Sequence, residues 1–412
     1  MMMMKTTAAS IAALVLGTGA AFADCGIESG SVRILANDFD ALGIVIDEAK
    51  TCASDTVSVE ANMTSEHKSL QVPALTIDPA QYTVALVANN SIVPLLNDDL
   101  IRPLDDLVAE YGDSLQESQL IRVDGKVMAI AFMGNAQHLF MRSDILEEAG
   151  IEAPTSYEEI LEAAKVLREK GIMEYPLAAA DLPGWNLAAE FVNMYLGMGG
   201  DFFEAGSAEP SINNETGMKT LEMMKALTEY MSPEYMTYDA NEMKALYLAD
   251  EVAIMNQWGS MVNGHIDPEG PAPEIGEATV LAPAPFVGGG STPAAALWWD
   301  GFTIAKNISD EDAAASFQAM VYGARPEVAQ ANPTGATWLM KDFDAPASAN
   351  GVLGTAAEGA RAYPMTPYMG LLHTALGAEL AEFMQGSEGA EQALSDVEAA
   401  YRAAATEAGF LN

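Results

Sequence analysis

Aromatic rings and a carboxylate that could bind a hydroxyl-rich molecule gather in the middle of the chain. Sugars present hydroxyl groups to planar hydrogen-bonding partners and C–H faces to aromatic rings. Trp258 follows an apolar segment at 253–256, while Trp298, Trp299 and Asp300 immediately precede another apolar segment. Open α/β sheets bind ligands at the carboxyl ends of their strands. We therefore expect these side chains to face one ligand cleft.

Polar side chains also interrupt an apolar run near residue 135. The run 126–132 is strand-like and follows the tight-turn dipeptide Asp124-Gly125. Asn135, Gln137 and His138 come next, before the apolar pattern resumes. This segment predicts a crossing between two domains, and Asn135 and Gln137 are candidates for ligand binding.

Further candidates stand where strands end or helices begin. They are Asn37 and Asp38 after the first predicted strand, Glu66 at the start of the second helix, Asn89 after the third strand and Trp185 at the start of an apolar stripe. The alternative role for the polar members is helix capping, and for any single tryptophan it is a place in the core.

The elements expected around these candidates alternate between strand and helix, which is typical of an α/β domain with a largely buried sheet. The first expected strands are 32–35, 56–61 and 82–88, with helices at 40–52 and 65–75. Later helices are expected at 157–170, 215–230, 310–322, 369–384 and 388–408, and later strands at 253–256 and 301–305.

Four short pieces stand in a fixed order over the segment 125–159: Gly125-Lys126, 142–146, 149–151 and 154–159. In this order and spacing the segment resembles the family 1 extracellular solute-binding proteins, the carbohydrate receptors of ATP-driven importers. The resemblance implies a two-lobed, type II periplasmic-binding-protein fold with a ligand cleft between lobes joined by a hinge. It also implies three crossings between the lobes, which places 24–134 and 301–344 in one lobe and 135–300 and 345–412 in the other.

The resemblance implies a receptor that captures a neutral carbohydrate or polyol by hinge closure and delivers it to the permease subunits of an ABC importer. We expect a monomer without enzymatic activity, cofactor or metal. One alternative is a receptor of the same fold for polyamines or other cations, in which Asp38, Glu66 and Asp300 would converge. Another is a periplasmic glycosidase with two opposed carboxylates.

Residues 1–23 have the pattern of a signal peptide, with one cation, an apolar run and the small-x-small ending Ala21-Phe22-Ala23. We expect cleavage after Ala23 and release into the periplasm. The residues before Cys25 lack the pattern that lipid attachment requires, so we do not expect a lipoprotein. In this oxidising compartment Cys25 and Cys52 are expected to form a disulfide.

The charge of the chain excludes two classes of partner. Its 412 residues include 19 basic and 59 acidic ones, for a net charge of −40. Nucleic acids and anionic membranes are bound mainly through Lys and Arg. We therefore expect no nucleic acid and no anionic membrane surface among its partners.

Overall fold

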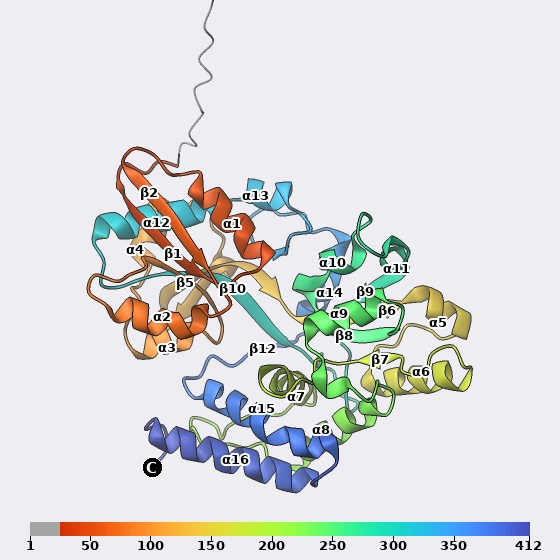
Figure 1. Cartoon of the computed structure of the whole chain (residues 1–412). Coiled ribbons are helices and arrows are strands. Elements are labelled where there is room, and N and C mark those ends of the chain that lie inside the picture. Colours follow the sequence, from red (N-terminus) through yellow and green to blue (C-terminus); the bar gives the residue numbers. More distant parts are fainter. Residues whose placement is uncertain (1–24) are drawn as a thin grey trace, which may run out of the picture.

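The computed structural model describes residues 25–412, and within them an eight-stranded mixed sheet forms one half of the molecule (Figure 1). Its main strand order is β11-β5-β10-β3-β1-β2, with β4 paired to β5 and β12 paired to β10. β1 is parallel to β2 and β3, whereas β10 is antiparallel to β3 and β5. The strands are β1 (Gly30–Ala36), β2 (Val57–Met63), β3 (Val84–Ala88), β4 (Leu120–Val123), β5 (Lys126–Asn135), β10 (Ala296–Ile304), β11 (Thr337–Trp338) and β12 (Arg361–Ala362).

Two cores cover opposite faces of this first sheet. Successive side chains of a strand point to opposite faces, and β3 shows this alternation. Val84 and Leu86 pack into a core with helices α1 (Asp40–Lys50) and α12 (Asp310–Gly323). Their neighbours in β3 pack on the other face against helices α2 and α3. The first sheet is therefore buried on both sides, as the near-continuous apolar run 82–88 predicts.

The remaining helices of this half are α2 (His67–Thr76), α3 (Ile92–Asn97), α4 (Asp105–Tyr111) and α13 (Pro326–Ala331), with the short 3-10 turn η1 (Glu117–Gln119). Cys52 lies two residues after the end of helix α1, and its disulfide to Cys25 fixes the start of the described chain to this helix; the two Cα atoms are 5.6 Å apart. The predicted disulfide is confirmed.

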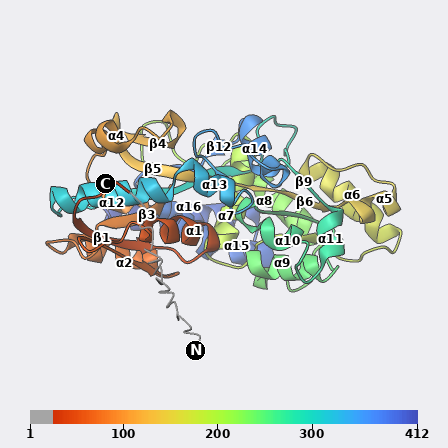
Figure 2. The same cartoon turned by 90° about the horizontal axis from the view of Figure 1, so that it is seen from above.

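A second, four-stranded sheet forms the other half, with strand order β7-β8-β6-β9. Figure 2 shows the two halves side by side along the long axis of the molecule. The strands are β6 (Gln137–Arg142), β7 (Leu177–Ala178), β8 (Ile254–Trp258) and β9 (Thr279–Ala282). The helices and 3-10 turns of this half are α5 (Ser143–Ala149), α6 (Tyr157–Glu169), α7 (Trp185–Gly197), α8 (Glu215–Thr228), η2 (Tyr235–Thr237), α9 (Ala240–Leu248), η3 (Gly259–Met261), α10 (Asn263–Ile266), α11 (Pro273–Ala278), η4 (Ala347–Ala349), α14 (Asn350–Ala357), α15 (Met369–Gln385) and α16 (Ala390–Glu407).

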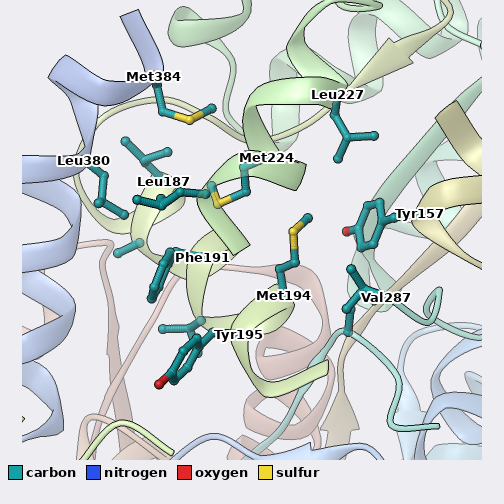
Figure 3. Packing of buried hydrophobic residues seen from close by; sticks show 14 of the residues in the cluster. Tyr157, Leu187, Phe191, Met194, Tyr195, Met224, Leu227, Val287, Leu380 and Met384 are labelled. Atoms are coloured by element: carbon teal, nitrogen blue, oxygen red, sulfur yellow. The ribbon is translucent and has the colours of Figure 1, made fainter. Parts of the chain in front are cut away.

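Helix α7 forms the centre of the second half, because its residues are buried on almost every side from Leu187 to Gly197. Phe191 and Tyr195 pack toward α15, while Met194 lies near Tyr157 of α6 (Figure 3). Such an all-round apolar helix is typical of a buried core element. α6 begins with the predicted capping box, in which the Ser156 hydroxyl accepts a hydrogen bond from the Glu159 amide.

The predicted α/β architecture is confirmed, and most predicted elements lie within a few residues of the observed ones. Two expectations about the crossing segments are wrong. β10 begins at Ala296, so Trp298, Trp299 and Asp300 lie inside a strand instead of before it. β5 continues to Asn135 because this residue pairs with Trp298 of β10.

Within the part of the chain that the structure describes, no helix is both long and apolar enough to cross a bilayer. The predicted signal peptide, residues 1–23, lies outside the described residues.

Candidate ligand-binding cleft

A cleft of about 760 Å³ lies where elements of the two halves face each other. One wall belongs to the first sheet and comprises the β1–α1 connection, the start of α2, the end of β3 and the loop 331–335. The other wall belongs to the second half and comprises the start of α7, the end of β8, α9 and the segment 260–264. We call these the first wall and the second wall. β10 contributes residues between them.

Three tryptophans meet in this cleft from three separate elements. Trp185 is the first residue of α7, Trp258 is the last residue of β8 and Trp298 lies in β10. Their ring centroids are 5.9–6.1 Å apart in each of the three pairs. Trp185 remains 40% exposed, so its ring is available to a ligand. Together the rings form an apolar surface that suits the C–H faces of a small molecule.

Trp185 and Trp298 are held in place by a buried pair behind them, Tyr363 and His373. The Tyr363 ring stacks on Trp298 at 4.2 Å, and the His373 ring lies 5.2 Å from that of Trp185. His373 Nε2 donates to the Trp185 carbonyl at 3.0 Å, which leaves Nδ1 to accept from the Tyr363 hydroxyl at 3.0 Å. Burial lowers the pKa of His373 to about 4, so the ring is neutral at pH 7 and both bonds persist.

Asp300 brings a carboxylate to the same cleft from β10. Burial raises the pKa of Asp300 to about 7, although the ammonium of Lys68 acts in the opposite direction. Lys68 Nζ lies 5.8 Å from the centroid of the Trp185 ring. The next residue, Gly301, follows an irregularity in the strand pairing, and a Cβ there would come within 2.2 Å of the Ile130 carbonyl oxygen. Glycine is therefore required where β10 carries Asp300 into the cleft.

Asparagine is the most frequent polar residue of the cleft. Of the described residues, six asparagines line it: Asn37, Asn90, Asn135, Asn241, Asn263 and Asn332. Asn135 already uses its side chain within the protein, since Nδ2 donates to the Ser260 hydroxyl at 3.1 Å and Oδ1 accepts from the Ser260 amide at 3.1 Å. By contrast, Asn90 Oδ1 and Trp298 Nε1 are buried and have no hydrogen-bond partner within residues 25–412. Unpartnered buried polar atoms in a cleft are ready to bond a ligand.

The family of the chain follows from its sequence match. Residues 69–327 match the model of the bacterial extracellular solute-binding proteins. The chain belongs to this family.

Solved structures share the fold of this solute-binding protein at low sequence identity. Maltose-bound MalE3 from T. maritima has a TM-score of 0.77 and 17% identity over 90% of this chain and 99% of its own. A solute-binding protein from Agrobacterium radiobacter K84 in complex with ribitol has a TM-score of 0.76 and 19% identity over 90% and 97% of the two chains. One from Agrobacterium vitis S4 with bound D-mannitol has a TM-score of 0.74 and 17% identity over 93% and 100%.

Family membership makes the chain an extracellular solute-binding protein and not an enzyme, which confirms the predicted family and class. Among the described residues, no group of three or more His, Cys, Asp or Glu side chains is placed to hold a metal ion.

The solute-binding cleft brings together some of the candidates predicted from the sequence and leaves others outside. Those that line it are Asn37, Asn135, Trp185, Trp258, Trp298 and Asp300. Those that do not are Asp38, Glu66, Asn89, Gln137 and Trp299. Asp38 and Glu66 are exposed on the surface beside the first wall.

Asn89 and Trp299 belong to the framework of the first half. The side chain of Asn89 donates to the Leu297 carbonyl at 3.3 Å and accepts from the Trp299 amide at 2.8 Å. This side chain therefore joins the end of β3 to β10. The Trp299 ring packs against the core beside α2 and α3, away from the other tryptophans.

Gln137 lies in a buried polar network of the second half. It donates to Glu190 at 2.8 Å and accepts from Asn193 at 2.9 Å and Asn256 at 3.3 Å. Burial raises the pKa of Glu190 to about 7. The network fastens β6, α7 and β8 to one another, so it positions Trp185 and Trp258 from behind the cleft.

Sequence reasoning missed several polar residues that line the cleft. They are Lys68, Asn241, Lys244, Ser260, Asn263, Asn332 and Thr334. His67 and Asn90 also line the cleft, and the sequence gives a signal for both, since they adjoin Glu66 and Asn89 at a predicted helix start and strand end. Lys68 and Lys244 carry no such signal, because each lies within a helix whose orientation the sequence does not define.

Proposed function

We propose that this chain is an exported receptor that captures a sugar or polyol in the cleft and delivers it to the membrane permease subunits of an ABC importer. The observation that carries the proposal is the group of three tryptophan rings beside Asp300 and the unpartnered Asn90 Oδ1. Rings match the C–H faces of such a ligand, and the polar atoms match its hydroxyls. The solved structures bound to maltose, ribitol and D-mannitol support the same ligand class.

Hinge closure is the proposed means of capture. We assign 24–134 and 301–344 to one lobe and 135–300 and 345–412 to the other. Strand pairing supports this division, since most strands of the first sheet lie in the first set and all those of the second sheet lie in the other. A ligand that contacts both walls completes its bonds only when they approach, so it favours the closed state by its differential affinity.

The structure gives less support to the two alternatives. A polyamine receptor predicts that Asp38, Glu66 and Asp300 converge with few amides nearby. Of these three carboxylates only Asp300 lines the cleft, whereas six asparagines do. A glycosidase needs two opposed carboxylates. Two carboxylates, Asp40 and Asp300, line the cleft. The observation against a glycosidase is therefore the family of the chain, which is one of receptors.

A thermal-shift screen tests the proposal directly. The mature protein is heated with monosaccharides, oligosaccharides, polyols and polyamines, since a ligand that binds only the folded state raises the melting temperature by mass action. We expect a rise with at least one sugar or polyol and none with polyamines. A shift with polyamines alone would replace the proposal by the cation receptor. Incubation with oligosaccharides followed by product analysis tests the glycosidase.

The site of action follows from the same proposal. We assign cleavage after Ala23, release as a monomer into the periplasm and no lipid anchor on Cys25, whose sulfur is bonded to Cys52. Mass spectrometry of protein from the periplasmic fraction gives the start of the mature chain. A chain that begins at Cys25 with an added lipid would contradict this assignment.

A further inference from the structure

Two lysines of the cleft stand apart from almost all other cations of the protein. Acidic residues outnumber basic ones by 59 to 19, so nearly every cation has a carboxylate within reach. Among the described residues, only four basic side chains have neither an ion pair with a carboxylate nor a hydrogen bond to a carbonyl oxygen: Lys68, Lys126, Lys244 and Lys341. Two of the four line the ligand cleft.

The two cleft lysines lie on opposite walls. Lys68 belongs to α2 in the first wall, and Lys244 belongs to α9 in the second wall. Lys68 is near enough to Asp300 for their charges to interact, but the two groups form no ion pair within 4.0 Å in the described structure. Lys244 forms no ion pair among the described residues and lies beside Gly264, in a cleft that Asn241 and Asn263 also line.

The start of α1 adds donors to the same cleft. Residues Phe39 to Leu42 line it, and the N-cap residue Phe39 offers no side-chain acceptor to the first-turn amides. A helix N-terminus attracts negative charge. The carboxylates that line the cleft are Asp40 and Asp300. Asp40 is exposed at the start of α1, and the raised pKa of Asp300 means that it is not fully ionised near pH 7.

We propose that the ligand is a sugar or polyol that carries one acidic group, which the ammonium groups of Lys68 and Lys244 bind when the two walls close on it. This inference rests on the proposed function and specifies the chemistry of its ligand. The proposed ligand is acidic, whereas the sequence led us to expect a neutral carbohydrate or polyol. The acidic group supplies the ion-pair partner that both lysines lack among the described residues, while the tryptophans contact the carbon skeleton. A carboxylate, a sulfate and a phosphate share this chemistry.

Matched ligands test the inference by isothermal titration of the mature protein. Each acid is compared with its neutral parent: D-gluconate with D-glucitol, D-glucuronate with D-glucose, and D-galacturonate with D-galactose. Glucose 6-phosphate and glucose 6-sulfate separate the acidic groups from one another. We expect at least one acid to bind about tenfold or more tightly than its parent at low salt, with a difference that shrinks at high salt because salt screens exposed charges.

Lysine variants test whether the preference for the acid depends on Lys68 and Lys244. Lys68→Met and Lys244→Met should each weaken binding of the acid about tenfold and binding of the neutral parent by less than about threefold. Lys126→Met and Lys341→Met are matched controls, since both lysines are exposed, unpaired and outside the cleft, and they should change neither.

The possible outcomes separate this inference from the proposed function. Neutral parents that bind as tightly as their acids, or tighter, overturn the acidic ligand and leave the sugar receptor standing. Acid preference that survives both cleft-lysine substitutions overturns the role of the lysines. Binding of neither acids nor neutral sugars and polyols overturns the proposed function itself.

Discussion

The two walls of the cleft differ in what they offer a ligand. The second wall presents the rings of Trp185 and Trp258 beside two asparagines and the ammonium of Lys244, whereas the first wall presents amides and the ammonium of Lys68 and has no tryptophan among the described residues. Aromatic stacking tolerates a range of ligand orientations, while hydrogen bonds to amides have narrow distance and angle requirements. We infer that the second wall supplies much of the contact area and that the first wall supplies most of the discrimination.

The walls also differ in how they are supported. Trp185 and Trp258 are positioned by the buried network of Gln137, Glu190 and Asn256. The first wall rests on α1, which begins at the cleft and is followed by the disulfide at Cys52. A change to a support should therefore lower stability and leave binding largely intact. A change to a residue that lines a wall should lower affinity and leave stability largely intact.

Removal of the disulfide should have the largest effect on stability. A Cys25→Ser/Cys52→Ser variant frees a loop with a sequence separation of 27 residues, and the unfolding free energy should fall by about 3–4 kcal/mol on the chain-entropy model. Urea unfolding monitored by circular dichroism measures this loss. Binding at 20 °C should persist, because no contact to the cleft is removed. Loss of binding in a variant that is still folded would show that the disulfide also sets the geometry of the first wall.

Truncation of a ring in the second wall should have the largest effect on binding. Trp185→Ala removes a side chain that is 40% exposed, so the melting temperature of the free protein should change little. Affinity for the tightest compound of the screen should fall about 30-fold, or about 2 kcal/mol, as for other aromatic contact residues. Titration calorimetry measures this change. Leu353→Ala is the control, because Leu353 is 39% exposed and lies outside the cleft. An equal loss in both variants would contradict the role of the ring.

Asp300→Asn should give a pH-dependent change in stability. Burial raises the pKa of Asp300 from 3.8 to about 7, so the folded state holds this proton more tightly than the unfolded chain does. The stability that Asp300 contributes is therefore present below about pH 4 and is lost as the pH rises through about 7. Asparagine stays neutral throughout.

The unfolding free energy of Asp300→Asn minus that of the wild type should accordingly increase between pH 4.5 and pH 8, by about 3 kcal/mol. Urea unfolding of both proteins across this range measures the difference, in which the titration of the other groups cancels. A difference that stays constant with pH would show that Asp300 is ionised in the folded state across the whole range.

Much of this fold could be predicted because its signals are local. The alternation of strands and helices, the Ser156 cap of α6 and the disulfide each depend on a few neighbouring residues. The crossing strands were harder to predict. β10 extends back to Ala296 because its first residues pair with β12 and the next ones with β5, and both strands are distant in sequence. Long-range pairing of this kind leaves no local pattern that would place Asp300 inside a strand.

The residues that line the cleft were also hard to predict from local sequence patterns. A polar residue at the end of a strand can point into a cleft or back into the protein, and a shift of one residue reverses the choice. Asn89 was predicted for the site, yet its neighbour Asn90 lines the cleft. Lys68 and Lys244 could not be predicted, since only the packing of α2 and α9 brings them to opposite walls.

This neighbouring pair of asparagines offers the smallest but most direct test of the first wall. Asn90→Ala removes a buried oxygen that has no hydrogen-bond partner in the part of the chain that the structure describes, so the melting temperature should hold or rise slightly while affinity falls about fivefold. Asn89→Ala leaves the Leu297 carbonyl and the Trp299 amide without their partner. The unfolding free energy should then fall by about 1–2 kcal/mol. Thermal melts with and without ligand measure both effects. If Asn90→Ala lowered stability as much as Asn89→Ala and left affinity unchanged, the first wall would serve as framework, and discrimination would have to come from the residues around Trp185 and Trp258.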